Sequence, residues 1–436
     1  MADLHAILSG RQQEQRGLFC VCSASELVIR AAARHAAAWN YTVSIEATAN
    51  QVDQFGGYTG LRPADYVQRV EELARSEGLP RDRLVLGGDH LGPLTWCRLP
   101  EAEAMARAEE LLRAYVLAGF EKIHLDTSMR LGDDDPEAPL DAAVCARRGA
   151  RLAQVVWDAF ARRRREHPDS PRPVLVIGSE VPIPGGSRFH EDSVTPTAPE
   201  DFRRQLDAFR DAFHRAGVPF DDVAAFVVQP GVEFGDDFVC QYDSAAAAGL
   251  MASRRGERVV FEGHSTDYQT QQSLTALVAD GVSILKVGPA LTFALREGLS
   301  LLEAVERELR PERPSGFREA LLAAMDADDR NWRGYYAGTP AEVAYKKLYS
   351  YSDRCRYYLP QPGPQQAIDA LLRSLEEIPP ALLSQYFPRQ YRRYMEGRLK
   401  PGALPVLCDR VGDVLDSYAR ACGISPPQAE AADIKR

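Results

Sequence analysis

The most constraining feature of the sequence is an alternation of eight short apolar runs with longer amphipathic stretches. The runs span residues 17–24, 41–48, 83–90, 122–128, 173–181, 223–231, 258–266 and 283–290. Several runs are apolar at every position, which is typical of parallel strands covered on both faces. Eight strand–helix units are most simply closed as a (β/α)₈ barrel, and a doubly wound open sheet is the alternative.

The stretches between the runs carry the end signals of helices. In the stretch 62–78, Pro63 stands near the first turn and Gly78 follows the last, the usual asymmetry of a helix. The stretch 100–119 begins with a proline and acidic residues that favour a helix N-terminus. Six further helices are predicted over residues 25–38, 140–165, 200–216, 243–254, 269–280 and 292–309. No Gly-rich phosphate turn follows the first run, which favours the barrel over the open sheet.

The alternation stops near residue 310. The segment "RPERPSG" (310–316) indicates a boundary, and most of the chain beyond it has a helical pattern. We therefore expect a barrel over residues 1–310 and a helical C-terminal extension over 311–436, packed on the barrel.

Composition narrows the class of protein. The 62 acidic and 52 basic side chains give a net charge of −10, which argues against nucleic acid as a partner. The eight cysteines form no C-x-x-C pair, so a reduced cytoplasmic chain is the simplest interpretation. Neither a secretion signal nor a run of about 18 apolar residues is evident, so no membrane partner is expected.

In barrel enzymes the active site forms at the carboxyl ends of the strands. Nearly every predicted strand ends in a polar or ionisable side chain, which a barrel built only for stability would not need. These strand-end residues are Glu46, Asp89, His90, Asp126, Glu180, Gln229, Glu262, His264 and Lys286.

Two of these residues are histidines on strands that open at the same barrel mouth. His90 and His264 are predicted to bind one divalent ion together with Glu180. Nitrogen and oxygen donors without thiolates suit Zn²⁺, Mn²⁺, Co²⁺ or Ni²⁺. The alternative is that each histidine is a hydrogen-bonded core residue. His124 lies inside its strand and is expected to be structural.

Asp89 stands directly before His90, and neighbouring residues of a strand point in different directions. One can therefore bind the metal while the other faces substrate, which makes Asp89 a candidate acid/base. The glycines around the pair are expected to let the backbone approach a ligand closely. Asp126 is either a second catalytic carboxylate or a residue that holds a metal ligand in place.

Long ordered motifs along the chain resemble the Z-type (GatZ/KbaZ-like) subunit family of class II tagatose-1,6-bisphosphate aldolase. The motifs are "EATANQVDQFGGYTG", "LGGDHLGP", "AGFEKIHLDTSM", "GSEVPIPGG", "VVQPGVEF", "GHSTDYQT", "ILKVGPALTFALRE" and "YSDRCRYY". The resemblance covers nearly the whole chain and implies a barrel of the class II aldolase type. It implies one of two roles: a metal-dependent 4-epimerase of ketohexoses such as fructose and tagatose, or a non-catalytic partner that activates a catalytic aldolase subunit.

The resemblance also implies roles for single residues. Asp89 and His90 resemble the Asp-His pair of class II aldolases, in which the Asp handles the proton on O4 and the His binds metal. His264 resembles the seventh-strand metal ligand. The sixth-strand histidine of those aldolases falls near Gln229, so one ligand is absent and Glu180 is expected to replace it.

The segment "HSTDYQT" (264–270) lacks the glycines of the aldolases' phosphate nest, which favours an unphosphorylated ketohexose. Alternatively, Arg354 and Arg356 of the C-terminal extension would bind a phosphate group of the substrate. Asp89 would take the O4 proton so that the C3–C4 bond breaks and re-forms, or would act opposite Asp126 in an enolisation. The residues expected to bind the sugar are Glu46, Asn50, Gln51, Ser128, Gln229, Asp267 and Lys286, although the first three could instead cap the following loop. A homo-oligomer is left open.

Overall fold

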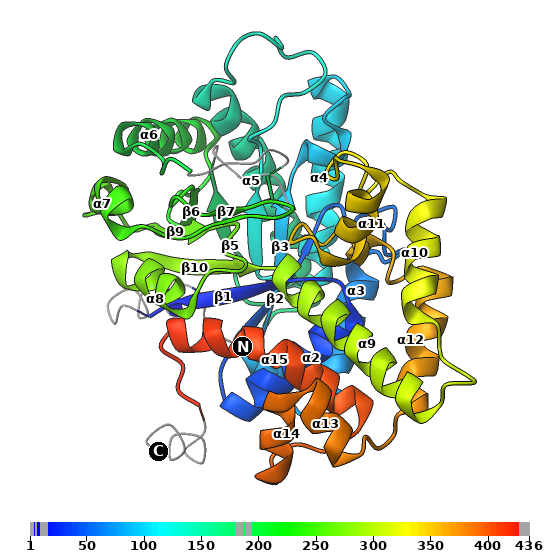
Figure 1. Cartoon of the computed structure of the whole chain (residues 1–436). Helices are drawn as coiled ribbons and strands as arrows, with labels where there is room; N and C mark the ends of the chain where they lie inside the picture. The colour runs from blue at the N-terminus through cyan, green and yellow to red at the C-terminus, as the bar shows by residue number, and fades with distance from the viewer. Residues whose placement is uncertain (1–3, 5–6, 9–15, 179–185, 188–193, 427–436) are drawn as a thin grey trace.

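The computed structural model describes residues 4, 7–8, 16–178, 186–187 and 194–426. Eight parallel strands close into one barrel in the order β1-β10-β9-β6-β5-β4-β3-β2, with helices around it (Figure 1). The strands are β1 (Leu18–Cys22), β2 (Val43–Thr48), β3 (Leu84–Leu91), β4 (Lys122–Leu125), β5 (Val174–Ile177), β6 (Val223–Val228), β9 (Val260–Gly263) and β10 (Val282–Val287). A separate two-stranded hairpin joins β7 (Glu233–Phe234) to β8 (Val239–Cys240). The predicted barrel is confirmed, and the open-sheet alternative is wrong.

All eight predicted helices form between and after the barrel strands. They are α2 (Glu26–Trp39), α3 (Pro63–Ser76), α4 (Glu101–Ala118), α5 (Ala142–Glu166), α6 (Pro199–Ala216), α7 (Ser244–Ser253), α8 (Gln271–Asp280) and α9 (Pro289–Leu309). Gly119 and Gly217 end α4 and α6 in the left-handed region, where a residue without Cβ is favoured. None of the helices in the described part of the chain is long and apolar enough to cross a membrane.

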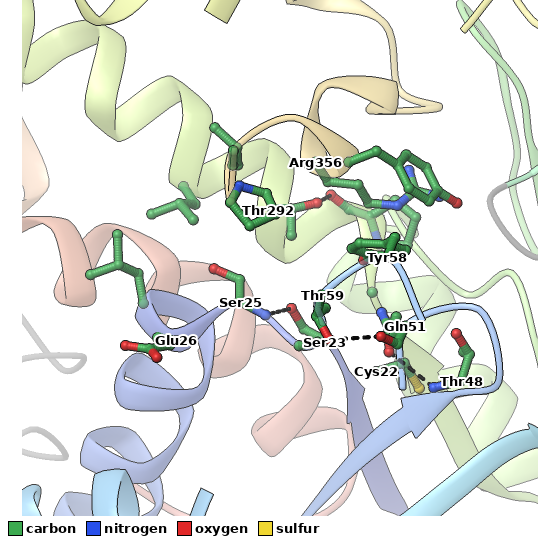
Figure 2. Close-up of a pocket in the computed structure, with 18 of the residues that line it drawn as sticks. Cys22, Ser23, Ser25, Glu26, Thr48, Gln51, Tyr58, Thr59, Thr292 and Arg356 are labelled. Atoms are coloured by element: carbon green, nitrogen blue, oxygen red, sulfur yellow. Dashed lines mark hydrogen bonds between the residues drawn. The ribbon is translucent and has the colours of Figure 1, made fainter. Parts of the chain in front are cut away.

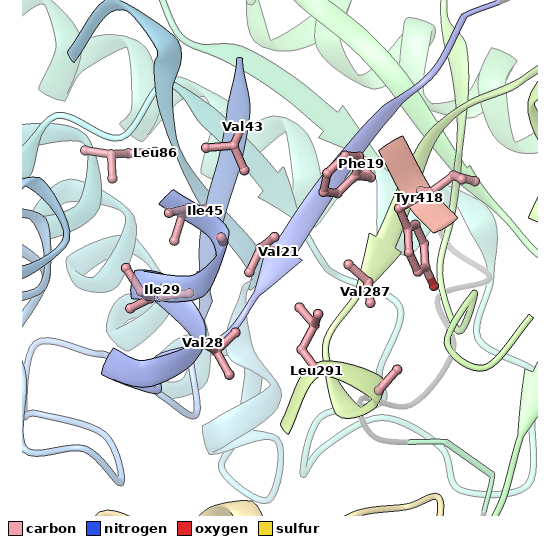
Figure 3. Close-up of a cluster of buried hydrophobic side chains, with 14 of the residues drawn as sticks. Phe19, Val21, Val28, Ile29, Val43, Ile45, Leu86, Val287, Leu291 and Tyr418 are labelled. Atoms are coloured by element: carbon pink, nitrogen blue, oxygen red, sulfur yellow. The ribbon is translucent and has the colours of Figure 1, made fainter. Parts of the chain in front are cut away.

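The outward-facing side chains of the strands pack against the helices. Phe19 and Val21 of β1 point away from the barrel axis toward Val28 of α2 and toward Tyr418 near the C-terminus (Figure 3). These side chains are at most 2% exposed. Alternation along each strand therefore leaves the other set of side chains to fill the barrel interior.

The interior changes character from the amino ends to the carboxyl ends of the strands. The lowest inward positions are apolar, and they include Leu18, Val85, Val174, Val260 and Ile284. A layer of buried charges comes next. Glu262 on β9 and Lys286 on β10 stand two residues beyond Val260 and Ile284, and Lys122 begins β4, with Glu46 on β2 beside them. The next inward positions bring Asp89, His124 and His264 to the mouth. The apolar floor supports a polar site that opens at the carboxyl ends, as barrel enzymes arrange it.

The C-terminal extension is helical, as predicted. Its helices are α10 (Phe317–Ala327), α11 (Pro340–Tyr349), α12 (Pro362–Ser374), α13 (Pro380–Tyr386), α14 (Pro388–Met395) and α15 (Ala403–Ala421), with a 3₁₀ turn η3 at Arg354–Tyr357. Helix α15 packs against α2, α8 and α9 of the barrel (Figure 1). The Tyr418 hydroxyl of α15 donates a hydrogen bond to the carbonyl oxygen of Thr266, 2.6 Å away, beside the barrel mouth.

The division of the chain at residue 310 stays a prediction, and truncation tests it. Residues 1–310 alone would lose helix α15, which packs against α2, α8 and α9 and whose Leu407, Leu415 and Tyr418 are each at most 2% exposed in the full chain. Each buried side chain of this kind contributes about 1.5–3 kcal/mol, and the whole fold is stable by only about 5–15 kcal/mol. We expect the fragment to show no cooperative thermal transition by circular dichroism. A fragment that melts at the temperature of the full chain would show that the barrel folds independently.

Candidate active site

Three histidine rings meet at the carboxyl ends of the third, fourth and seventh strands. The ring centroids of His90 and His264 lie 4.9 Å apart, those of His124 and His264 5.1 Å, and those of His90 and His124 5.2 Å. All three side chains are buried. The structure thus brings the predicted pair His90 and His264 together. It adds His124, which was expected to be structural only.

The site offers a donor set that fits a divalent cation. One ligand atom from each of Asp89, His124, Glu262 and His264 can be chosen so that all four lie within 4.8 Å of one another. The Nε2 atom of His124 is buried and has no hydrogen-bond partner among the described residues, so this nitrogen is available to a ligand. Burial lowers the pKa of His264 to about 4, which keeps its imidazole in the neutral form that metals bind. Imidazole and carboxylate donors of this kind suit Zn²⁺, Mn²⁺, Co²⁺ or Ni²⁺.

A buried carboxylate contacts the Nδ1 side of the His90 ring. Its Nδ1 lies 3.0 Å from Asp126 Oδ2, and the Ser128 hydroxyl donates to Asp126 Oδ1 at 2.6 Å. Burial would raise the pKa of Asp126, but its bond with His90 brings that pKa down to about 2. A carboxylate on one ring nitrogen orients the other nitrogen toward a metal. Neither Asp126 nor Ser128 lines the cavity, so their geometry fits a positioning role for His90.

Glu180, the third predicted metal ligand, lies outside the described residues, and its role stays a prediction. Within the described part of the chain, Glu262 is the glutamate that reaches the histidines. Its Oε1 lies 2.9 Å from His264 Nε2. Glu262 lies on β9, and His264 follows directly after the end of this strand, two residues further along the chain, so both face the barrel interior.

A layer of buried ion pairs supports the histidines. Lys122 Nζ lies 3.0 Å from Glu46 Oε1 and 2.7 Å from Glu262 Oε2. Lys286 Nζ pairs with Glu46 and lies 3.0 Å from Asp89 Oδ1. These five side chains are at most 5% exposed. Two ammonium groups face three carboxylates, so the layer keeps one net negative charge that favours a bound cation.

The ammonium group of Lys286 determines the protonation state of Asp89. Burial would raise the pKa of Asp89, but Lys286 and then His90 bring it well below its ordinary value. The carboxylate is therefore ionised at neutral pH. His90 itself has a backbone φ of 49°, an uncommon left-handed conformation for a histidine, of the kind that clusters at functional sites.

The glycines beside Asp89 make room for other protein groups. A Cβ on Gly87 would lie 2.5 Å from Cγ of Glu46, and a Cβ on Gly92 would collide with the carbonyl oxygen of Asp126. Gly87 therefore admits the buried Glu46 carboxylate, and Gly92 lets the end of β3 approach the end of β4. The expectation that these glycines serve the approach of a ligand is not what the structure shows.

A cavity of about 670 Å³ opens above the histidines. Its volume lies within the range of about 300–1,000 Å³ that is usual for small-molecule sites. Figure 2 shows Arg356 and Thr292 on one side of it, facing Ser23 and Gln51 on the other. Arg356 comes from η3, so the C-terminal extension forms part of the wall of the site.

The predicted sugar-binding residues divide into two groups. Asn50, Gln51, Asp267 and Lys286 line the cavity, whereas Glu46, Ser128 and Gln229 do not. The Gln229 Oε1 atom accepts hydrogen bonds from the backbone N–H groups of the following turn at 2.8 and 2.9 Å, so this side chain is occupied as a cap.

The two arginines of the extension also differ. Arg356 lines the cavity, whereas Arg354 does not. The guanidinium of Arg354 stacks over the rings of Tyr335 and Tyr357, 3.8 and 4.5 Å from their centroids. Of the two, only Arg356 is placed to reach a group bound in the cavity.

The sequence matches the family described as D-tagatose-1,6-bisphosphate aldolase subunit GatZ/KbaZ-like over residues 4–423. The chain belongs to this family. A crystal structure described as a probable tagatose 6 phosphate kinase from Sinorhizobium meliloti 1021 is 43% identical, covers 93% of this chain and all of its own, and has a TM-score of 0.84. A fructose-bisphosphate aldolase from Campylobacter jejuni is 16% identical over 85% of this chain and 91% of its own, with a TM-score of 0.44. The predicted family is confirmed.

The contribution of His124 to metal binding in this GatZ/KbaZ-like protein can be measured directly. We expect His124→Ala to weaken binding of Mn²⁺ or Zn²⁺ by more than the roughly 10–100-fold loss that follows removal of a group that only supports a ligand. Isothermal titration calorimetry on chelator-treated protein measures this. His214→Ala, which changes an exposed histidine on α6, is the matched control and should bind as the unchanged chain does. Equal affinity in the two variants would remove His124 from the site.

Proposed function

We propose that this GatZ/KbaZ-like protein is a metal-dependent ketohexose 4-epimerase that interconverts fructose and tagatose. The observation that carries the proposal is the convergence of His90, His264 and the ionised Asp89 at the floor of an open cavity, with His124 packed against both histidine rings. The amide of Asn50 adds neutral hydrogen-bonding groups to its wall, as a polyhydroxylated ligand requires, whereas the amide oxygen of Gln51 accepts a hydrogen bond from the N–H of Thr48 at 2.9 Å and so caps its own loop.

A divalent ion held by His124, Glu262 and His264 would supply electrostatic stabilisation for negative charge that develops on the sugar oxygens. In the proposed reaction Asp89 takes the proton from the O4 hydroxyl of the sugar. The O4–H electrons then form the C4 carbonyl, and the C3–C4 pair moves to C3, which leaves an enediolate and an aldehyde. Rotation of the aldehyde before the C3–C4 bond re-forms inverts C4, and Asp89 returns the proton. Lys286, 3.0 Å from Asp89, keeps this carboxylate ionised and oriented.

The alternative enolisation route needs a base on each face of the sugar, with Asp126 opposite Asp89. Asp126 lies behind His90, is 2% exposed and does not line the cavity. This placement supports the bond-cleavage route, with Asp89 as the single base.

The test is to incubate the purified chain alone with D-fructose and Mn²⁺, Ni²⁺ or Zn²⁺ and to follow D-tagatose by chromatography. The proposal predicts tagatose in the presence of the ion and none after treatment with a chelator. Run in deuterium oxide, the cleavage route predicts tagatose without deuterium at C4, whereas enolisation would introduce it.

A second candidate follows from the family description, which names a subunit of tagatose-1,6-bisphosphate aldolase. In that role the chain would stabilise or activate a separate catalytic aldolase subunit and would convert no sugar itself. Absence of tagatose with every metal, together with a strong increase in the activity of the catalytic subunit, would favour this candidate over the epimerase.

A further inference from the structure

The N-terminus of helix α9 opens at one corner of the cavity. Strand β10 ends at Val287, and Gly288 and Pro289 begin the helix and line the cavity. β9 and β10 are the seventh and eighth strands of the barrel in chain order. In barrel enzymes the loops after these two strands and a helix N-terminus frequently form the site for a phosphate group, because free backbone N–H groups point at it.

In this protein a carboxylate of the chain occupies that position. Asp267 Oδ1 accepts hydrogen bonds from the N–H of Gly288 at 2.9 Å and from the N–H of Ala290 at 2.8 Å. Asp267 lines the cavity and is 3% exposed. The two N–H donors that a phosphate oxygen would use are therefore already bound by an anion of the protein.

The loop that carries Asp267 is held in place on both sides. Thr266 donates through its hydroxyl to the carbonyl oxygen of Lys286 at 2.6 Å, and its own carbonyl accepts from the Tyr418 hydroxyl at 2.6 Å. Ser265 and Tyr268 have backbone φ values of 52° and 62°, so the turn is tight. These contacts oppose any swing of Asp267 away from α9 to admit a competing anion.

The lysine and arginine side chains that line the cavity already have partners in the protein: Arg30 pairs with Glu77, and Lys286 pairs with Glu46 and Asp89. Arg356 is the cation that faces this part of the cavity from the extension, and its Nη1 already donates to the carbonyl oxygens of Ser352 and Asp353 at 2.5 and 2.9 Å. Burial raises the pKa of Asp267 to about 6, although the two backbone N–H groups oppose this. At pH 8 the carboxylate is thus ionised, and a phosphoryl group at this corner would meet a negative charge.

We propose that Asp267 is a specificity-determining residue, an internal anion that fills the phosphate position at the N-terminus of α9. It makes the site accept ketoses that present an uncharged hydroxymethyl group at this corner and reject ketose phosphates that place a phosphoryl group there. The choice of a ketose as ligand rests on the proposed function. The exclusion of phosphate at this corner does not, and it can be measured without any turnover.

The experiment compares Asp267→Gly and Asp267→Asn with the unchanged chain. The glycine variant frees both N–H donors, whereas the asparagine variant keeps an oxygen on them and loses only the charge. Inorganic phosphate, D-fructose 1-phosphate and D-fructose 6-phosphate are titrated at pH 8 by calorimetry, with chelator-treated protein so that no cation binds the phosphate. We expect Asp267→Gly to bind phosphate and one of the two sugar phosphates at least tenfold more tightly than the unchanged chain, and Asp267→Asn to gain clearly less.

Two results would overturn the proposal. One is a folded Asp267→Gly variant, checked by circular dichroism, that gains no affinity for phosphate. The other is an unchanged chain that binds both fructose phosphates as tightly as fructose, and this comparison decides the question even where the glycine variant fails to fold. A chain that binds phosphate only after Asp267→Gly, yet converts no fructose, would support the phosphate exclusion and reject the epimerase.

Discussion

Asp89→Asn is expected to lower the turnover number for conversion of fructose to tagatose by about 10²- to 10⁴-fold, the usual contribution of a positioned acid/base group. The amide keeps the size of the side chain but cannot take the O4 proton. Because Asp89 carries the reacting proton in both directions, the forward and reverse rates should fall together.

Steady-state kinetics with fructose and with tagatose measure this effect. Asp369→Asn is the matched control, since Asp369 lies on α12 at the wall of the same cavity and its carboxylate accepts a hydrogen bond from Gln365 of that helix at 2.9 Å. We expect the control to keep its turnover number. If Asp89→Asn turned over sugar as fast as this control, the base would have to be another group.

Lys122→Met should give the largest loss of stability of any single change at the site. Lys122 is fully buried and bridges Glu46 and Glu262, so its removal leaves Glu262 without its nearest ammonium group and Glu46 with Lys286 alone. Breaking a buried ion pair by removing one partner costs about 3–5 kcal/mol. Urea unfolding at neutral pH measures the free energy of unfolding of the variant and of the unchanged chain.

The loss of stability in Lys122→Met is expected to be largest at neutral pH and smaller in acid. Burial would raise the pKa of Glu46 and of Glu262, but Lys122 and Lys286 bring both below their ordinary values in the folded chain. This contribution to stability is therefore fully present at neutral pH, begins to fall as the pH drops below the ordinary glutamate pKa of about 4.3, and is lost as the pH falls further through the lowered pKa values of the folded chain. The difference between Lys122→Met and the unchanged chain should shrink in acid. A difference that does not shrink between pH 7 and the lowest pH at which both chains still unfold cooperatively, well below 4, would contradict the role given to these ion pairs.

The barrel could be predicted from the sequence because eight apolar runs at regular spacing leave few ways to cover both faces of a parallel sheet. The rule that barrel sites form at strand ends led to Asp89, His90 and His264, because the carboxyl ends of all eight strands meet at one mouth of the barrel. It gave His124 a structural role only, because this residue lies inside its run, ahead of Leu125 and Asp126. The residues 122, 124 and 126 alternate along one strand, so a period of two would have placed all three on the inner face.

Other parts of the site were beyond pattern reasoning. The pairing of Lys122 with Glu46 and Glu262 depends on the stagger of three strands around the barrel, which no local signal encodes. The contribution of Arg356 to the cavity depends on how the extension packs, and the two hydrogen bonds of Asp267 depend on the geometry of the turn after β9. These features arise from contacts between residues far apart in sequence.

The most direct test of the central claim is anomalous X-ray diffraction from crystals of the Mn²⁺-loaded protein. The arrangement of His90, His124, His264, Asp89 and Glu262 predicts a single strong anomalous peak among these side chains, at the floor of the cavity. A peak elsewhere on the chain, or none at saturating Mn²⁺ with the histidine cluster intact, would contradict the claim that this barrel mouth is a metal site.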